Sequence, residues 1–166
     1  MPLNLDEIDL RILDALQGDG HLSTAEIAKR VGLSQSPCWR RIRRLEALGV
    51  IRERVAILEP EVLGFEVTAF ASIKLSEHGR RALPEFEAAI MALPEVVDAY
   101  AMTGEVDYLL RVVTRDIRSY ERLLRDALLN LPTVREVHSQ IALSRVKSTT
   151  RLPLEKLVDS AVRPAS

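Results

Sequence analysis

The sequence predicts an α+β chain of two domains, in which a helical domain is followed by a β-α-β-β-α-β domain. Up to about residue 50, apolar residues recur at three- and four-residue steps, the period of an amphipathic helix. From about residue 66 the period changes to two, which is typical of strands in a sheet. We therefore expect a helical domain at 1–51, a strand and hinge at 52–65, a sheet domain at 66–150 and a tail at 151–166.

The composition is that of a globular protein with an aliphatic core. Of 166 residues, 47% are hydrophobic and only 4% are aromatic. No run of roughly 18 apolar residues suggests a membrane span, and the first residues lack the basic and apolar regions of a secretory signal. The single cysteine, Cys38, excludes an internal disulfide and a multi-cysteine metal cluster. We expect a cytoplasmic protein that does not contact a membrane.

The net charge of −1 hides a strong asymmetry. Residues 1–28 hold one basic and six acidic side chains, whereas residues 29–54 hold eight basic and two acidic ones. Positive charge concentrated in one stretch is the electrostatic footprint of a protein that binds a polyanion.

Three helices are predicted in the first 50 residues. The first carries an apolar stripe, can be capped by Asn4 with Glu7 three residues later, and ends at Gly18 to Gly20. The second begins at Ser23, with Glu26 completing a capping box, and stops at Gly32. The stripe of the first helix consists of Leu5, Ile8, Ile12 and Leu16.

A third, arginine-rich helix is predicted to open at Ser36-Pro37 and to end at Gly49, which completes the spacing of a helix-turn-helix. Its inward face holds Cys38, Ile42 and Leu45, and its outward face holds arginines and Trp39. The following segment, Ile51 to Leu58, is predicted to be a strand with Arg52 and Arg54 on one side, serving either as a wing or as a connection.

The second domain alternates between strands and helices. The predicted order is a strand from Val67 to Leu75, a helix from Leu83 to Leu93, strands at 96–103 and 108–113, a helix over 120–131 capped by Asp116, and a last strand at 134–146. This order is the ferredoxin-like arrangement. Each predicted helix ends at a Leu-Pro pair, and the next strand begins at a valine two residues after the proline, in Leu93-Pro94-Glu95-Val96 and in Leu131-Pro132-Thr133-Val134. This repetition supports a doubled βαβ unit.

Two helices cover only one face of such a four-stranded sheet. The other face would carry Thr68, Phe70 and Ser72, a partly apolar set, so we expect it to pack on another copy of the chain. The tail from Leu152 is predicted to fade into disorder, although Leu154, Leu157 and Val158 could form a short docked helix.

With both halves in view, the chain resembles the leucine-responsive/asparagine-responsive (Lrp/AsnC) family of bacterial and archaeal transcription regulators, over about residues 5 to 150. The resemblance implies a winged helix-turn-helix domain, a ferredoxin-like βαββαβ effector (RAM) domain, and dimers that assemble into tetramers, octamers or larger discs. It also implies an amino acid or related small effector bound between subunits. The motifs that carry it are Leu5-Asp6-Glu7-Ile8-Asp9, Arg11-Ile12-Leu13, Val31-Gly32-Leu33-Ser34, Pro37-Cys38, Arg41-Ile42-Arg43-Arg44-Leu45-Glu46 and Gly104-Glu105-Val106-Asp107-Tyr108-Leu109-Leu110.

The family commonly has Gly-Asp where this chain has Gly104-Glu105. The added methylene shifts the carboxylate, so the turn could accept a different ligand or respond weakly. Trp39 and the ending from Lys147 to Pro153 are similar to a branch that includes cysteine-responsive regulators.

Double-stranded DNA is the predicted partner of the third helix, whose first turns would enter the major groove. Base contacts are predicted for Gln35, Ser36, Trp39, Arg40 and Arg43. Phosphate contacts are predicted for Arg44, Lys29, Arg30, Arg52 and Arg54. A merely solvated arginine face is the alternative, and Trp39 could equally pack against a neighbouring element.

The effector would bind at the turn formed by Gly104, Glu105, Val106 and Asp107, where glycine allows close approach to the backbone and carboxylates can engage an amino group. An ordinary hairpin is the alternative. The resemblance points to Gln140, Ile141 and Ala142 of a neighbouring subunit as the opposite wall, and these three could equally be interface packing.

Other functions find little support in the residues. Cys38 is better explained as a small buried hydrophobe than as a redox sensor, and His21, His78 and His138 lack metal-ligand spacing. The sequence offers no Ser-His-Asp set and no glycine-rich phosphate loop, so no enzyme and no cofactor are expected. An architectural protein that wraps DNA with little sequence choice remains the alternative to a sequence-specific regulator.

Overall fold

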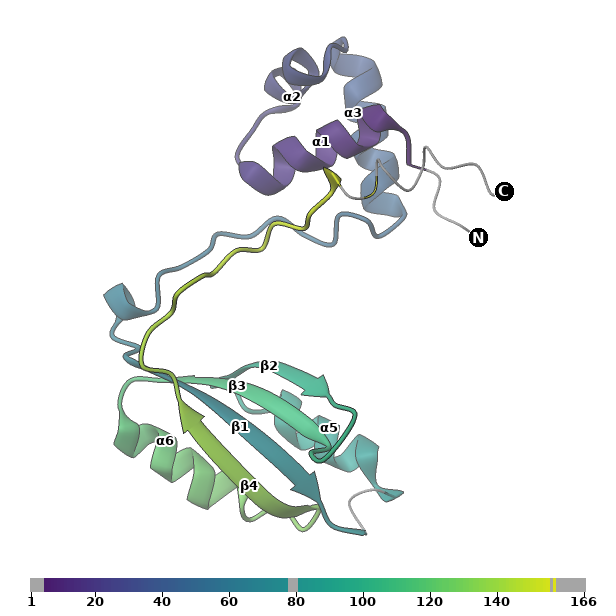
Figure 1. Ribbon diagram of the computed structural model, residues 1–166. Helices are drawn as coiled ribbons and strands as arrows, with labels where there is room; N and C mark the ends of the chain where they lie inside the picture. The colour runs from purple at the N-terminus through teal and green to yellow at the C-terminus, as the bar shows by residue number, and fades with distance from the viewer. Residues whose placement is uncertain (1–4, 78–80, 156, 158–166) are drawn as a thin grey trace. The chain divides into compact units, whose positions relative to one another are not determined.

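The computed structural model describes residues 5–77, 81–155 and 157 (Figure 1). The chain forms two compact units, one made of residues 1–57 with 147–166 and the other of residues 58–146. Asn4, His78 and Val158, for which the sequence suggested a cap, a metal-site candidate and a docked helix, lie outside the described residues.

The first unit contains α1 (Glu7–Gly18), α2 (Thr24–Val31) and α3 (Gln35–Ala47). The predicted second helix is confirmed: Ser23 and Glu26 form a capping box and Gly32 ends the helix with φ +74°. The prediction for α1 was wrong by two residues, since Asp6 is the N-cap and Asp9 completes the box. The two aspartates form the reciprocal pair of bonds expected of Asn4 and Glu7, but to the backbone N–H groups two residues later, those of Asp6 and Asp9.

The start of α3 also differs from the prediction. The N-cap is Ser34, and Pro37 lies at the third helical position rather than the first. Proline is tolerated there because the first-turn N–H groups have no partner within the helix. Gly49 follows the helix at φ +71°, as predicted. The core buried between the helices includes Ile12, Ile27, Val31, Cys38, Ile42 and Leu45.

The predicted strand from Ile51 to Leu58 does not form a ladder among the described residues. A strand requires a partner for its backbone N–H and C=O groups, and no neighbouring strand of the described chain supplies one. The side chains of Val55 and Ile57 are 69% and 75% exposed. The predicted strand is therefore wrong for the described chain, and of the two roles left open the segment has that of a connection between the two units.

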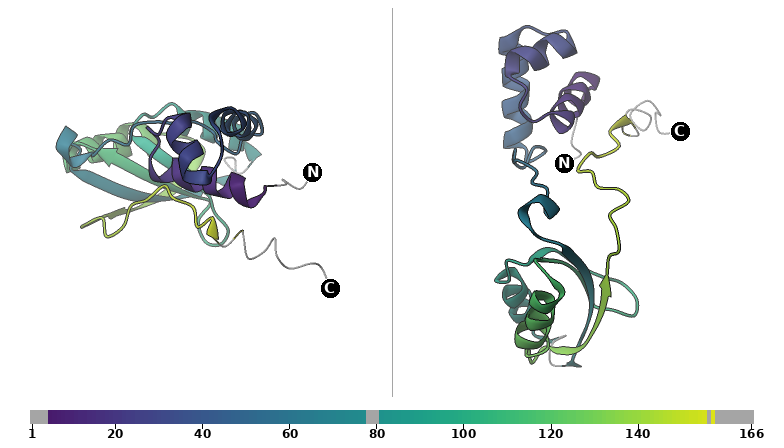
Figure 2. Two further views of the ribbon diagram at one scale, coloured as in Figure 1. Left: turned by 90° about the horizontal axis from the view of Figure 1, so that it is seen from above. Right: turned by 90° about the vertical axis from the view of Figure 1, so that its left-hand side faces the viewer.

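The second unit is a four-stranded antiparallel sheet in the order β2-β3-β1-β4, with its two helices on one face (Figures 1 and 2). The elements are β1 (Val67–Leu75), α5 (Leu83–Met91), β2 (Val96–Ala101), β3 (Tyr108–Thr114), α6 (Ile117–Leu123) with a π-helical extension (Leu124–Leu128), and β4 (Val134–Ile141). A short 3-10 helix, Glu61–Leu63, precedes β1. The predicted βαββαβ order and the Asp116 cap are confirmed.

The alternation predicted for β1 is confirmed, since Ala69, Ala71, Ile73 and Leu75 are all buried in the sheet core. From the helical layer, Phe86, Ile90, Tyr120 and Leu128 pack on them. The last strand ends at Ile141 rather than at residue 146. Its partner β1 begins at Val67, so only the bond from the Ala142 N–H to the Thr68 carbonyl, 2.9 Å, continues beyond it.

Among the described residues of the second unit, no helix covers the opposite face of the sheet. Thr68, Phe70 and Ser72 on β1 are half-buried. Register places Leu109 beside Ser72, and Arg111 beside Phe70. This face also carries an ion pair between Arg111 Nε and Asp98 Oδ2 at 2.5 Å.

The C-terminal segment returns to the first unit and contacts α1. Arg151 forms an ion pair with Asp14 at 2.9 Å. The Gln17 side chain and the Leu152 backbone exchange two hydrogen bonds of 2.9 and 3.0 Å, and Leu154 packs against the helical core. In the part of the chain that the structure describes, no helix combines the length and apolarity needed to cross a bilayer.

Candidate nucleic-acid interface and effector turn

The outward face of α3 is formed by the residues that the sequence predicted. Burial of Cys38, Ile42 and Leu45 fixes the rotation of the helix, so the remaining positions face away from the core. Gln35, Ser36, Arg40 and Arg43 are exposed. Trp39 is 52% exposed, and the Arg43 guanidinium lies 5.6 Å from its ring centre. Such a cation–π contact holds both side chains in a defined position on the same face.

Most of the basic residues predicted to contact phosphate lie at the end of α2 or in the segment after α3. Lys29 and Arg30 are exposed near the end of α2. Arg52 pairs with its neighbour Glu53 at 3.1 Å, and Arg54 pairs with Glu46 at 3.2 Å. These are exposed pairs of modest strength, so both guanidinium groups can exchange a carboxylate for a phosphate.

A hollow of about 560 Å³ lies beside α3 in the first unit. Its lining brings together the predicted base-contact pair Trp39 and Arg43 with the predicted phosphate contacts Arg52 and Arg54. Residues from the helix and from the following segment therefore line one concavity, in which three arginines are accompanied by Glu46 and Glu53, and sequence position alone did not reveal it.

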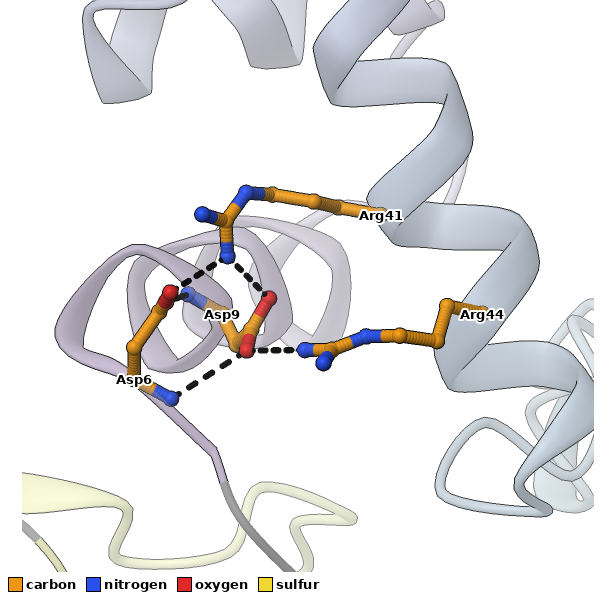
Figure 3. A network of polar contacts seen from close by, with 4 residues as sticks. All are labelled: Asp6, Asp9, Arg41 and Arg44. Atoms are coloured by element: carbon orange, nitrogen blue, oxygen red, sulfur yellow. Dashed lines mark hydrogen bonds and ion pairs between the residues drawn. The ribbon is translucent and has the colours of Figure 1, made fainter.

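Two arginines of α3 bind instead to the start of α1 (Figure 3). Arg41 Nη1 contacts Asp6 Oδ2 at 2.6 Å and Asp9 Oδ1 at 2.8 Å. Arg44 Nη2 contacts the second carboxylate oxygen of Asp9. Hydrogen bonds to Asp6 and Asp9 raise the pKa of Arg41 above its ordinary value. The phosphate contact predicted for Arg44 stays a prediction, in competition with this ion pair.

Asp9 was missed as a functional candidate. It is completely buried although charged, and buried charges are rare unless they are paired. The signal was present in the sequence: an aspartate lies at a position adjoining the apolar stripe of α1, opposite a helix rich in arginine.

The predicted effector turn is closed by a backbone hydrogen bond. The Met102 N–H donates to the Asp107 carbonyl at 2.9 Å, and Gly104 has φ +108°, a value that side chains rarely allow. Gly104 and Glu105 are exposed, and Val106 is half-buried. The turn thus presents backbone and one carboxylate to solvent.

Asp107 connects the turn to β1. Its carboxylate accepts a hydrogen bond from the Leu75 N–H at 2.8 Å, and its N–H donates to the Ile73 carbonyl at 2.9 Å. Next to it, Tyr108 donates to Glu87 at 2.7 Å. Burial, together with this hydrogen bond, raises the pKa of Tyr108 to about 12.

Within one chain, the turn and the predicted opposite wall do not meet. Tyr108, which follows the turn, pairs with Ile73 of β1, whereas Gln140 pairs with Phe70. These positions are three residues apart along β1, about 10 Å at the usual rise, and on opposite sides of that strand. Gln140 and Ile141 are exposed, and Ala142 is half-buried.

The remaining candidates are structural. Cys38 is fully buried, as predicted, and burial raises the pKa of its thiol. Among the described residues, no group of three or more His, Cys, Asp or Glu side chains is placed to hold a metal ion.

Comparison with known proteins identifies both units. Residues 5–52 match the model described as winged helix-turn-helix DNA-binding, and residues 68–152 match the Lrp/AsnC ligand binding domain. The chain belongs to the Lrp/AsnC family of transcriptional regulators. It is a DNA-binding regulator with an amino-acid ligand-binding domain, not an enzyme.

Relatives match along nearly the whole chain. The glutamate uptake regulatory protein of Zymomonas mobilis is 38% identical over 161 residues, which is 97% of this chain and 98% of that protein. The leucine-responsive regulatory protein of Salmonella typhimurium is 38% identical over 152 residues, covering 92% and 93%. These relatives differ in the amino acid that their names mention, so placement in a cysteine-responsive branch stays a prediction.

Solved structures share the fold. A transcriptional regulator from Neisseria meningitidis in complex with L-Met has a TM-score of 0.87 and 36% identity, covering 93% of this chain and 99% of that one. An AsnC family regulator from Agrobacterium tumefaciens has a TM-score of 0.86 and 44% identity, covering 92% and 99%.

Proposed function

We propose that this Lrp/AsnC-family regulator binds specific DNA through the outward face of α3, and that an amino acid bound between subunits adjusts that binding. Base readout falls to Gln35, Ser36, Trp39, Arg40 and Arg43. Phosphate binding falls to Lys29, Arg30, Arg52 and Arg54, whereas Arg44 is held by Asp9. As a chromosome-binding protein it would act in the cytoplasm.

The observation that carries the DNA assignment is the hollow beside α3, which three arginines line on an outward face. It joins the outward face of α3, which carries Arg43, to Arg52 and Arg54 of the following segment. Arginine provides a fork that can bond bidentately to guanine in the major groove. Phosphate contacts from the flanking cations position the helix without reading sequence.

The effector is proposed to be a small amino acid held by Gly104, Glu105, Val106 and Asp107 of one subunit against Gln140, Ile141 and Ala142 of another. The separation of these two segments on a single sheet supports a site shared between copies. The L-Met complex of the Neisseria meningitidis regulator supports an amino acid as ligand. Glu105 retains an anionic group for an ammonium ion, but one bond further from the backbone than aspartate would place it.

Self-association is part of the same proposal. The open sheet face combines Phe70 and Leu109 with Thr68 and Ser72, a surface that a second copy of the chain could cover. Dimers of this kind would set the spacing between two α3 helices and hence between two DNA half-sites. Effector binding that favours one assembly would then change which DNA sites fit.

A screen of all amino acids by thermal shift, followed by DNase footprinting with and without any amino acid that binds, tests the proposal. The footprint sequence would be obtained first by selection from a random duplex library. We expect at least one amino acid to raise the unfolding temperature and to change footprint affinity or spacing. If assembly state and DNA affinity stay constant across the whole panel, the sensing part of the proposal fails.

A further inference from the structure

We infer that Asp9 is a positioning residue for DNA binding, which holds Arg41 and Arg44 of α3 away from the phosphate backbone. The inference rests on the proposed role of α3 as the DNA-facing helix. We call Asp6, Asp9, Arg41 and Arg44 the α1–α3 clamp (Figure 3).

The clamp places donors on both oxygens of a buried carboxylate. Asp9 Oδ1 accepts from Arg41, and Oδ2 accepts from Arg44 and from the Asp6 N–H at 3.2 Å. Asp6 in turn accepts from the Asp9 N–H at 2.8 Å and from Arg41 at 2.6 Å. Partial burial opposes ionisation of Asp6, but these hydrogen bonds outweigh it and lower its pKa.

This arrangement does two things at once. It fixes α3 against α1 at a defined rotation, because Arg41 and Arg44 lie on adjacent positions of one flank of α3 and are bound to one carboxylate. It also removes two of the eight cations of residues 29–54 from the set available to DNA. The clamp therefore lowers non-specific phosphate attraction while it orients the residues that read bases.

The salt dependence of binding to a random-sequence duplex measures this directly. The slope of log K against log salt changes by about 0.9 for each phosphate contact. In Asp9→Asn, which keeps the shape of the side chain but removes its charge, each released arginine that reaches a phosphate steepens the slope by about 0.9. We expect a steepening of about 0.9 to 1.8 relative to the wild-type protein.

Glu7→Gln is the matched control. Glu7 is exposed in the first turn of the same helix, two residues from Asp9, and its substitution changes the net charge by the same amount. A steeper slope in Asp9→Asn with an unchanged slope in Glu7→Gln supports the clamp. Equal slopes in Asp9→Asn and the wild-type protein overturn it, as does an equal steepening in both variants.

A second variant covers the case in which Asp9→Asn does not fold. Arg44→Gln leaves the wild-type slope unchanged if Asp9 already holds this arginine, and a slope reduced by about 0.9 overturns the inference. In the double variant Asp9→Asn/Arg44→Gln, the steepening should fall by about 0.9 from that of Asp9→Asn. A wild-type slope near zero would instead contradict the proposed DNA binding itself.

Discussion

Arg43 is the residue at which base readout can be separated from folding. Its side chain is 65% exposed, pairs with Glu46 at 3.2 Å and lies over Trp39. An exposed ion pair contributes below about 1 kcal/mol, and an exposed cation–π contact contributes about 0.5–1 kcal/mol. Arg43→Ala should therefore lower the free energy of unfolding by no more than about 2 kcal/mol, a change that urea denaturation can measure.

Arg43→Ala should change the affinity for DNA more than the stability, and this change should depend on the DNA sequence. A bidentate arginine–guanine contact is worth roughly 1–3 kcal/mol of discrimination, so Arg43→Ala should weaken binding to the selected site by about 5- to 150-fold. Binding to a scrambled duplex should fall much less. Fluorescence anisotropy with both duplexes at one fixed salt concentration measures the two affinities.

Arg43→Lys is the matched control, since it keeps the charge but loses the planar fork. We expect this variant to bind the scrambled duplex as the wild-type protein does and to lose most of the preference for the selected site. An equal loss of affinity for both duplexes in Arg43→Ala would refute base readout by this residue and would favour an architectural mode of binding.

Three further predictions concern single residues. Ser23→Ala removes the side-chain cap of α2 and should lower the free energy of unfolding by about 1 kcal/mol, measured by urea denaturation. The folded-state pKa of Tyr108, about 12, lies above the ordinary value of 10. The stability due to the protonated phenol is therefore complete below pH 10 and is lost as the pH rises through about 12. The loss is about 2–3 kcal/mol. In Tyr108→Phe, the free energy of unfolding should no longer show this alkaline loss. The added methyl group of Gly104→Ala meets no atom within 4 Å, so its cost is backbone strain of about 1–2 kcal/mol at φ +108°. In the same variant, the rise in unfolding temperature that a binding amino acid produces should be smaller.

The regular elements could be predicted because each has a local cause. Ser23, Glu26 and Gly32 define α2 by contacts within a few residues, and the alternation from Val67 to Leu75 reflects one buried sheet face. The segment from Ile51 to Leu58 has a similar pattern but forms no ladder in the described chain. Pairing depends on a second strand, which the pattern of one segment does not specify.

The outward face of α3 was predictable for the same reason, since three buried side chains determine its rotation. The α1–α3 clamp was not predictable, because it depends on which of several arginines contacts which of several acidic residues. Counting charges placed Asp9 in an acidic stretch and Arg44 in a basic one. Only the packing of α1 on α3 shows that these two charges satisfy each other.

Because the C-terminal segment contacts α1, the DNA-binding unit is built from two segments that the whole second unit separates in the sequence. A fragment that stops at Ile57 would lack Arg151, Leu152 and Leu154, and would leave Asp14 and Gln17 only their bond to each other. A chimaera that exchanges only the first 57 residues with a relative would join a foreign α1 to the original tail. A chimaera that takes both segments from one parent keeps these contacts matched.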